Sequence, residues 1–316
     1  MKDQPHIEKT PIKAAAPVVR DKYTAVWVSH SSMGDFLKCP RAYYLHNVYK
    51  DPKTRRKINV TTPALALGVA VHEVVEGLAR FPTEERFARG TDALIADLDV
   101  AWKKVSGKKG GFRSAEEEAQ ARARAEAMVR RVVEHPEPLA HKTVKLAGKG
   151  SGKDEMPPNF YITDTDNIIL CGKIDWLIYR PEDDTVHILD FKTGKNQEDG
   201  ESLQLPIYQL LLANLQKRKV NGASYWYLDR DDAPVETDLP SVEESFERVI
   251  VVARQVAAAR AKALAEGPDK AFICPRVADG SGTECFACRP FQKILRGEAE
   301  YIGVGEYNQD LFMIPE

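Results

Sequence analysis

The chain has 316 residues, of which 43% are hydrophobic and 29% are charged, the composition of a globular protein with a buried core. It contains no run of about 18 apolar residues, which excludes a conventional transmembrane helix and gives no reason to expect a membrane partner. The net charge of −2 argues weakly against nucleic-acid binding. Because the N-terminus lacks the apolar core of a signal peptide, we expect a cytoplasmic location.

The first half of the chain is predicted to be helical. We expect a flexible N-terminal tail over 1–27 and a domain over 28–292, which is followed by a C-terminal tail over 293–316. Helices are predicted over 29–37, 43–48, 63–80, 84–105 and 114–135. The third of these has proline at its start, and the last two belong to a helical insert over about 81–158.

The second half carries the strand signals. Strands are predicted over 159–166, 168–180, 185–193 and 222–229. Helices are predicted over 201–218 and 241–266, and residues 267–316 are expected to be irregular, with a cysteine segment over about 267–292. A central sheet with helices before and after it predicts an α/β or α+β fold, with a catalytic core over about 159–230.

Three charged residues lie on two successive predicted strands: Asp175 on the first, and Asp190 and Lys192 at the end of the second. Side chains alternate along a strand, so Asp190 and Lys192 share a face and lie about 6.6 Å apart, whereas Leu189 and Phe191 point into a core. Two converging carboxylates can hold a hard divalent cation, and a lysine can orient a water or neutralise a phosphate. The pattern therefore favours metal-dependent cleavage of a phosphodiester over a surface Asp–Lys pair.

Further polar residues occur at helical spacing. Gln204 and Tyr208 are four residues apart and can bind DNA phosphates or hold the site in shape, although alone they would be a surface Gln and a packed Tyr. Gly68 and His72 share a face of an earlier helix, where glycine would allow another backbone to approach closely. His72 can be a further metal ligand or can simply pair with Glu76.

Basic residues cluster in the segments 53–57, 101–113 and 141–153. Such clusters can follow a phosphate backbone, although any one of them can also be a solvated loop. From two of these segments we expect DNA contacts by Lys103, Lys104, Lys108, Lys109, Arg113, Lys149 and Lys153.

The five cysteines are not expected to form disulfides, because the chain shows no secretory signal. Reduced thiols indicate metal ligation or burial instead. Cys171 lies within a predicted strand and is expected to be a packed thiol.

In chain order, the segments LGVAVH (67–72), GKID (172–175), DFKTGK (190–195) and QLPIY (204–208) resemble the motifs of the PD-(D/E)xK nuclease superfamily. With SHSSMGDFLKCPRAYYL at 29–45, they are most similar to its RecB-like branch, which includes the CRISPR-associated RecB-like exonucleases. The resemblance covers about 28–292 and implies a restriction-endonuclease-like core with a mixed sheet flanked by helices. Each motif alone is weak, but their order and spacing together are specific.

The resemblance also implies the roles of the site residues. The ligands of Mg²⁺ or Mn²⁺ would be His72, Asp175 and Asp190, with the Phe191 carbonyl as a fourth. An imidazole among them tilts the choice slightly towards Mn²⁺. Lys192 would position or activate the attacking water, and Gln204 and Tyr208 would support Lys192 and the DNA backbone.

The same branch often carries a [4Fe–4S] cluster, and the matching ligands here are Cys39, Cys274, Cys285 and Cys288. They would clasp the first helices to the C-terminal segment. The spacing departs from the familiar pattern, because ten residues separate Cys274 from the C-x₂-C pair and no cysteine follows Cys288. Zn²⁺ in a Cys₄ site is therefore an alternative, as are unliganded buried thiols.

The expected function is that of a metal-dependent deoxyribonuclease. We favour an exonuclease on single-stranded or resected DNA in recombination, repair or CRISPR-like processing. The alternatives are a non-cleaving DNA-binding or adaptor protein with a structural Cys₄ site, and an endonuclease. No helicase or ATPase motif is visible, so a helicase or another recombination or CRISPR protein would act in trans.

Overall fold

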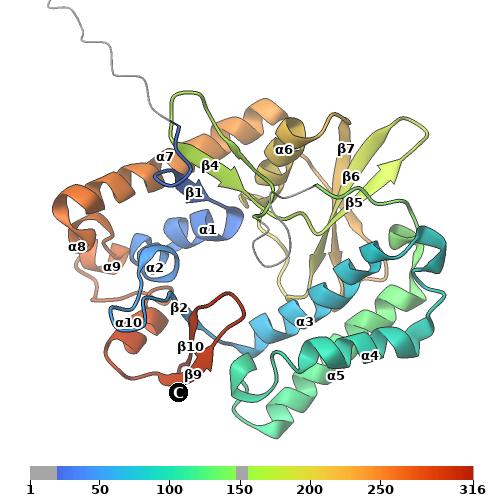
Figure 1. The fold of residues 1–316 in the computed structure, drawn as a ribbon, viewed down its shortest axis with the longest axis horizontal. Helices are drawn as coiled ribbons and strands as arrows, with labels where there is room; N and C mark the ends of the chain where they lie inside the picture. Colours follow the sequence, from blue (N-terminus) through green and yellow to red (C-terminus); the bar gives the residue numbers. More distant parts are fainter. Residues whose placement is uncertain (1–19, 147–155, 316) are drawn as a thin grey trace, which may run out of the picture.

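A four-stranded mixed sheet forms the centre of the fold in the computed structural model, which describes residues 20–146 and 156–315 (Figure 1). Its order is β5-β6-β7-β8, and the strands are Trp176–Arg180, Thr185–Lys192, Val220–Tyr227 and Val235–Thr237. β6 pairs antiparallel with β5 and parallel with β7. The mixed central sheet expected from the sequence is confirmed.

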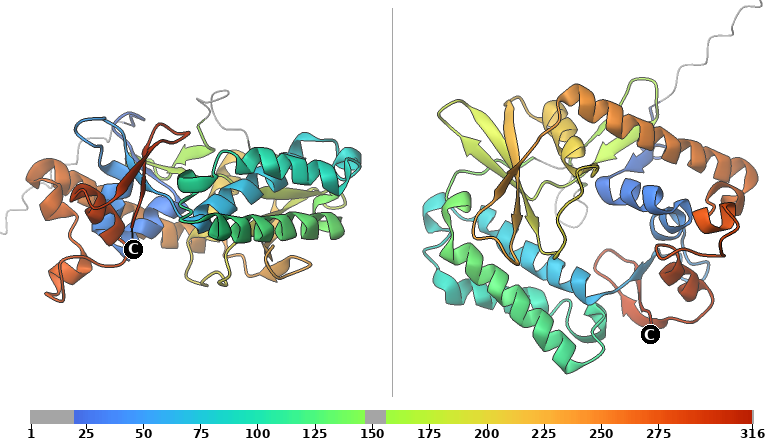
Figure 2. Two further views of the ribbon diagram at one scale, coloured as in Figure 1. Left: turned by 90° about the horizontal axis from the view of Figure 1, so that it is seen from below. Right: turned by 180° about the vertical axis from the view of Figure 1, so that it is seen from behind.

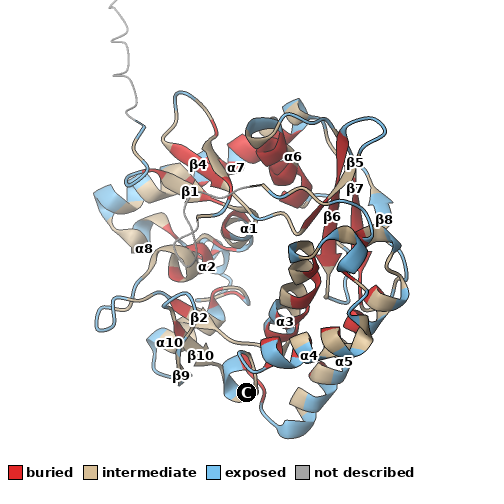
Figure 3. Cartoon of the chain, turned by 45° about the vertical axis from the view of Figure 1, so that its right-hand side comes forward, coloured by how far each residue is buried: buried red, intermediate tan, exposed pale blue. Residues whose placement is uncertain are grey.

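Helices cover both faces of this sheet. Successive side chains of β6 point in opposite directions, so each face presents apolar side chains that a layer of helices buries. Ile188 packs in the core that includes α6 (Gln204–Leu215) and α7 (Val242–Glu266). Leu189 and Phe191 pack on the other face, against α3, α4 and α5 (Pro63–Gly77, Gly90–Trp102 and Ala115–Glu134). Every residue of β6 except Lys192 is buried, and Figure 3 shows β6 and β7 as buried strands between the helices.

The long helices begin at residues that cap their first turn. The Thr62 side chain accepts a hydrogen bond from the Leu65 N–H at 3.3 Å, and Pro63 follows at a position where no N–H is needed. α3 then runs to Gly77 and continues as a 3₁₀ turn over Leu78–Arg80, which matches the predicted helix over 63–80.

The segment predicted as one strand over 168–180 forms two strands in two sheets. β4 (Ile168–Cys171) lies between β1 (Val26–Val28) and β3 (Asn159–Tyr161), whereas β5 belongs to the central sheet. A Cβ on Gly172 would come 3.0 Å from Leu211 Cδ1, so the chain passes close to α6 and bends there. The prediction was wrong because this packing interrupts the strand between its two halves.

Residues 267–316, expected to be irregular, contain short helices and a β-hairpin within their described part. The helices are α8, α9 and α10 (Pro268–Ala271, Pro275–Ala278 and Arg289–Leu295), and the hairpin strands are β9 and β10 (Glu300–Val304 and Asp310–Met313). β10 pairs in parallel with β2 (Ile58–Val60), and Figure 2 shows the hairpin beside α10. The end of the chain is thus paired to its first quarter, which a local pattern could not indicate.

The N-terminal segment forms α1 (His30–Lys38), α2 (Pro40–Tyr43) and a π-helical turn over Tyr44–Val48, close to the predicted helices. Of the flexible tail predicted over 1–27, residues 1–19 lie outside the described residues, and β1 already begins at Val26. Among the described residues, no helix combines the length and apolar character that crossing a membrane requires.

Candidate active site

His72 and Glu76 lie one turn apart on α3 and face Asp175, which immediately precedes β5. His72 Nδ1 lies 3.1 Å from Glu76 Oε1 and 3.5 Å from Asp175 Oδ2. One ligand atom from each residue lies within 4.8 Å of the others. Two carboxylates and an imidazole at this spacing fit a single Mg²⁺ or Mn²⁺ ion. From the sequence, Glu76 was expected only as a partner of His72, and the structure adds it to the ligand candidates.

Gly68 lies where α3 packs closely against the end of the sheet. A Cβ at this position would lie 3.2 Å from Thr193 Oγ1, just beyond the end of β6. The close approach predicted at Gly68 is therefore present, but it involves a side chain rather than a second backbone. His72 is one turn further along α3 and is thereby held beside Asp175.

The backbone at the end of β6 orients Asp175. The Phe191 N–H donates a hydrogen bond to Asp175 Oδ2 at 3.0 Å. This bond holds the Asp175 carboxylate, which lies just before β5, against the backbone of the neighbouring strand β6. The metal-ligand role expected for the Phe191 carbonyl stays a prediction.

A second group of side chains surrounds Asp190, which is only 1% exposed. Tyr208 and Gln204 donate hydrogen bonds to Asp190 Oδ1 at 3.1 and 2.7 Å. Lys192 Nζ lies 2.9 Å from Asp190 Oδ2 and donates to Gln204 Oε1. Within the described part of the chain, Oδ2 has this ion pair but no hydrogen bond, so it keeps capacity for a cation. The structure thus brings together the four residues predicted at the ends of β6 and α6.

Glu198 is a site residue that the sequence analysis missed. It lies in the connection between β6 and α6, and its Oε2 is 3.1 Å from Lys192 Nζ. The Lys192 ammonium is therefore placed between two carboxylates and the Gln204 amide. An acidic residue in a polar loop belongs to no helix or strand period, so nothing in the sequence indicated that Glu198 lies near Lys192.

Several carboxylates of the site lie close together and are largely buried from water. Burial and the neighbouring Asp190 raise the pKa of Asp175 to about 7, with Glu76 adding to the effect and His72 opposing it. Burial works against the charged form of His72, but Glu76 and the two aspartates together raise its pKa. Burial also opposes the Lys192 ammonium, yet Asp190 raises the pKa of Lys192. A divalent cation would neutralise this excess of carboxylates.

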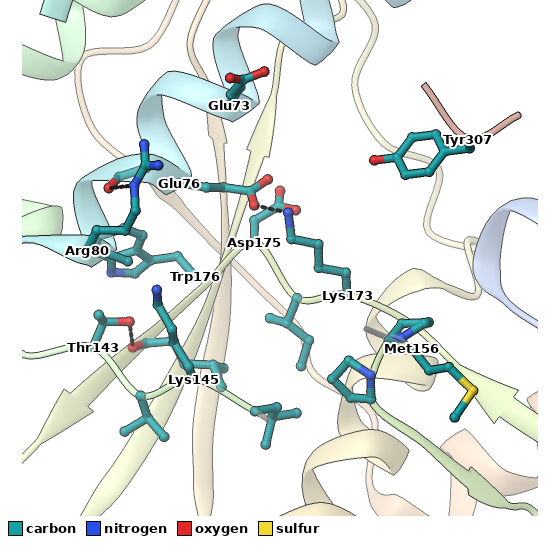
Figure 4. Close-up of a pocket in the computed structure, with 18 of the residues that line it drawn as sticks. Glu73, Glu76, Arg80, Thr143, Lys145, Met156, Lys173, Asp175, Trp176 and Tyr307 are labelled. Atoms are coloured by element: carbon teal, nitrogen blue, oxygen red, sulfur yellow. Dashed lines mark hydrogen bonds and ion pairs between the residues drawn. The ribbon is translucent and has the colours of Figure 1, made fainter. Parts of the chain in front are cut away.

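Two of the candidate ligands line a cleft of about 990 Å³, which Figure 4 shows in close-up. Glu76 and Asp175 line it together with the cationic side chains of Arg80, Lys145 and Lys173. Lys173 lies in the bend between β4 and β5 and forms an ion pair with Glu76 of α3. Carboxylates for a cation and ammonium groups for phosphate therefore face one space, which suits a phosphodiester substrate.

A family model for the PD-(D/E)XK nuclease superfamily matches residues 27–278. The chain belongs to the PD-(D/E)XK nuclease superfamily. This membership makes it a metal-dependent nuclease with DNA as its substrate, and it agrees with the geometry of the cleft. A search of curated proteins found no match.

The expected DNA contacts of this nuclease lie partly beside the cleft. Lys104 Nζ is 2.6 Å from Glu73 Oε1, and Glu73 lines the cleft, so Lys104 lies at its edge. Lys108 pairs with Glu300 at 2.6 Å, and a shallow depression beside that pair includes Lys103 and Lys109. The Arg113 N–H donates to Glu117 at 2.7 Å, whereas Lys149 and Lys153 lie outside the described residues. A DNA-binding role for these residues stays a prediction.

The four predicted cysteine ligands of the nuclease converge. The Sγ atoms of Cys39, Cys274, Cys285 and Cys288 all lie within 4.8 Å of one another, and all four residues are buried. Cys39 immediately precedes α2, whereas the other three precede α9 and α10, so the N- and C-terminal segments meet at this cluster as expected. A buried set of four thiols, with Ala42 and Ala287 packed against it, fits a Cys₄ metal centre.

The thiols differ in how readily they ionise. Burial raises the pKa of Cys39 to about 12. Burial also opposes the Cys285 thiolate, but the N–H groups of Cys288 and Ala287 lower the pKa of Cys285 to about 7. Cys171 lies apart from the cluster, 3.4 Å from the Val28 carbonyl, and burial raises its pKa to about 11, as expected of a packed thiol.

Proposed function

We propose that the chain is an exonuclease that hydrolyses phosphodiester bonds of single-stranded or resected DNA, in the manner of the RecB-like branch. The single observation that carries this proposal is the convergence of His72, Glu76 and Asp175 beside the Asp190–Lys192 pair. The choice of an exonuclease rests on the motif order, and the cleft supplies space and cations for a DNA strand.

In this proposal His72, Asp175 and Asp190 would hold the cation, and Glu76 would be a further ligand. A bound Mg²⁺ or Mn²⁺ supplies a water of lowered pKa and neutralises charge on the phosphate. Lys192 orients the attacking water, since Asp190, Glu198 and Gln204 hold its ammonium in place.

Gln204 and Tyr208 act on Asp190 from α6. Both donate to Asp190 Oδ1, which leaves Oδ2 for Lys192 and the cation. Their role is to orient the carboxylate, and through Gln204 Oε1 also the ammonium of Lys192. The Phe191 carbonyl would be the next ligand along β6.

Digestion of end-labelled DNA with Mg²⁺ or Mn²⁺ tests this proposal. Linear single strands should be degraded from an end, Asp175→Asn should abolish the activity, and Lys192→Ala should strongly reduce it. Cleavage of a circular single strand would identify an endonuclease instead. Binding without any cleavage under either metal would favour the DNA-binding adaptor.

We further propose that the four cysteines hold a metal centre. The resemblance implies a [4Fe–4S] cluster, with Zn²⁺ as the alternative. A single tetrahedral ion with Zn–S bonds of about 2.3 Å holds its sulfurs about 3.8 Å apart. Cys285 Sγ and Cys288 Sγ are 3.8 Å apart, and a cubane would require the four thiolates to spread, so the spacing favours a single ion.

Anaerobic purification with metal analysis identifies the centre. One zinc per chain and no visible colour would establish the single ion. A brown protein with a broad band near roughly 400 nm would establish the cluster. Cys274→Ser should remove either metal.

We propose that DNA reaches the cleft along the basic residues near α4 and α5, namely Lys103, Lys104, Lys108, Lys109 and Arg113. Lys149 and Lys153, which lie outside the described residues, are proposed as further contacts. We also propose a cytoplasmic site of action in recombination, repair or CRISPR-like processing, with a helicase or other partner protein in trans. Binding that weakens steeply with salt, and less steeply in Lys108→Ala, would support the basic path.

A further inference from the structure

A hairpin outside the matched family region forms one wall of the cleft. The turn between β9 and β10 contributes Glu306, Tyr307 and Asn308 to the lining that also includes Asp175. In Figure 4 the Tyr307 ring stands across the cleft from Lys173 and Asp175, with its hydroxyl directed towards them. Because the family match ends at residue 278, this wall is an addition to the matched nuclease region.

The turn that carries Tyr307 is held by its own backbone. The Gly305 N–H donates to the Gln309 carbonyl at 2.8 Å, and the Asn308 N–H donates to the Gly305 carbonyl at 3.1 Å. Asn308 has a φ of 56°, a left-handed conformation that asparagine tolerates better than most residues. The backbone at Tyr307 is therefore held in a closed turn.

The hairpin is also tied to the helix that carries the metal ligands. β10 pairs with β2, which leads directly into α3, and the Thr61 N–H donates to the Phe312 carbonyl at 2.9 Å. Asp310 is buried and lies 3.4 Å from Arg56, beside β2. Tyr307 is thus held in a fixed relation to His72 and Glu76, since both ends of the connection are anchored.

Tyr307 is nevertheless 86% exposed. In the part of the chain that the structure describes, its ring stacks on no other aromatic side chain. The cations Lys145 and Lys173 line the same cleft and can pair with phosphates on either side of a nucleotide. A free aromatic face beside cations is the arrangement by which proteins bind single strands without sequence preference.

We propose that Tyr307 stacks on an unpaired base of the strand whose phosphate enters the metal site, and so selects single-stranded ends. A base in a duplex cannot offer its face to Tyr307 without leaving the stack. Tyr307 is on this view a substrate-positioning residue. The inference rests on the proposed nuclease function and adds how the substrate is chosen.

Binding of a single-stranded oligonucleotide that carries 2-aminopurine tests the inference on the full-length protein. Without divalent metal, Tyr307→Ala should weaken binding about 5- to 100-fold and remove the quenching of the probe by stacking. Tyr307→Phe and Tyr307→Trp should bind as the wild type does, because they keep the aromatic face. Tyr23→Ala is the matched control, because Tyr23 is 85% exposed and is not among the residues that line the cleft.

With Mn²⁺, the Tyr307→Ala variant should have a higher KM for single-stranded DNA than the wild type. Its preference for single-stranded over duplex DNA should be much reduced. Unchanged binding and quenching in Tyr307→Ala would overturn the inference, as would a loss in Tyr307→Phe as large as that in Tyr307→Ala. If Lys192→Ala still strongly reduces the rate of cleavage in that case, the proposed function stands without the stacking. A wild-type protein that neither binds nor cuts DNA would overturn both.

Discussion

Glu76 connects His72 to Lys173. Its Oε1 lies 3.1 Å from His72 Nδ1, and its Oε2 forms an ion pair with Lys173, whose side chain is 72% exposed at the cleft. One carboxylate thus orients a candidate metal ligand and holds a cation where a phosphate would bind. This double contact makes Glu76 the residue whose change should affect metal and substrate together.

Glu76→Gln should lower the affinity for Mn²⁺ about 10- to 100-fold, because it removes a negative ligand and the acceptor that orients His72. Isothermal titration with Mn²⁺ measures the change. Glu73→Gln is the matched control on the same helix, because Glu73 pairs with Lys104 at 2.6 Å. An equal loss in Glu73→Gln would show that the effect is only one of total charge.

Lys192→Ala should reduce the rate of cleavage by about 10²- to 10⁴-fold and leave the Mn²⁺ affinity equal or higher. The reason is that the change removes an ammonium that lies 2.9 Å from Asp190 without removing a ligand. Single-turnover cleavage and metal titration measure the two effects separately. A variant that no longer binds Mn²⁺ would contradict the assigned role of Lys192.

Tyr208→Phe should destabilise the protein by about 1–2 kcal/mol, because Asp190 Oδ1 loses a buried hydrogen bond of 3.1 Å. Its effect on cleavage should be smaller than that of Lys192→Ala, since Gln204 still donates to the same oxygen. Urea unfolding measures the stability change. Tyr23→Phe, at an exposed position, should stay within about 0.5 kcal/mol of the wild type.

The Mn²⁺ affinity should rise with pH through about pH 7. A proton on Asp175, whose pKa is about 7, competes with the metal, and so does a proton on His72, whose pKa is also raised. The shift of Asp175 acts on the metal-free fold in the opposite sense. The folded pKa lies above the ordinary value of 3.8, so this group's contribution to stability declines as pH rises from about 4 to about 7.

Metal titrations and thermal unfolding across pH 5–8 measure both effects. Asp175→Asn, which cannot titrate, should remove this part of the pH dependence of the metal-free protein. A metal affinity that is constant between pH 5.5 and 7 would contradict the assignment of Asp175 as a ligand.

Cys39→Ser should release the metal centre and lower the unfolding temperature, because Cys39 supplies the N-terminal ligand that joins α2 to the C-terminal cysteines. Metal content and thermal unfolding measure the two changes. Cys171→Ala is the control, since Cys171 lies outside the cluster and should keep the full metal content. Retention of metal in Cys39→Ser would exclude the four-thiolate centre.

The sequence by itself determined the parts of the site that depend on local geometry. The two-residue repeat of a strand places Asp190 and Lys192 on one face, and the i, i+4 spacing of a helix places Gln204 beside Tyr208. Motif order identified the superfamily, and the resemblance picked out the four cysteines that converge in the fold. The placements on β6 and α6 were predictable because backbone periodicity alone decides which neighbouring side chains share a face.

Only the tertiary structure decided which distant groups meet. Glu76 turns towards Asp175, Glu198 reaches Lys192, and the strand predicted over 168–180 breaks at Gly172 because α6 packs against it. The pairing of β10 with β2 brings Tyr307 to the cleft from the far end of the chain. Such contacts depend on how whole elements pack around two cores, and packing energy is a property of the assembled fold that no short segment carries.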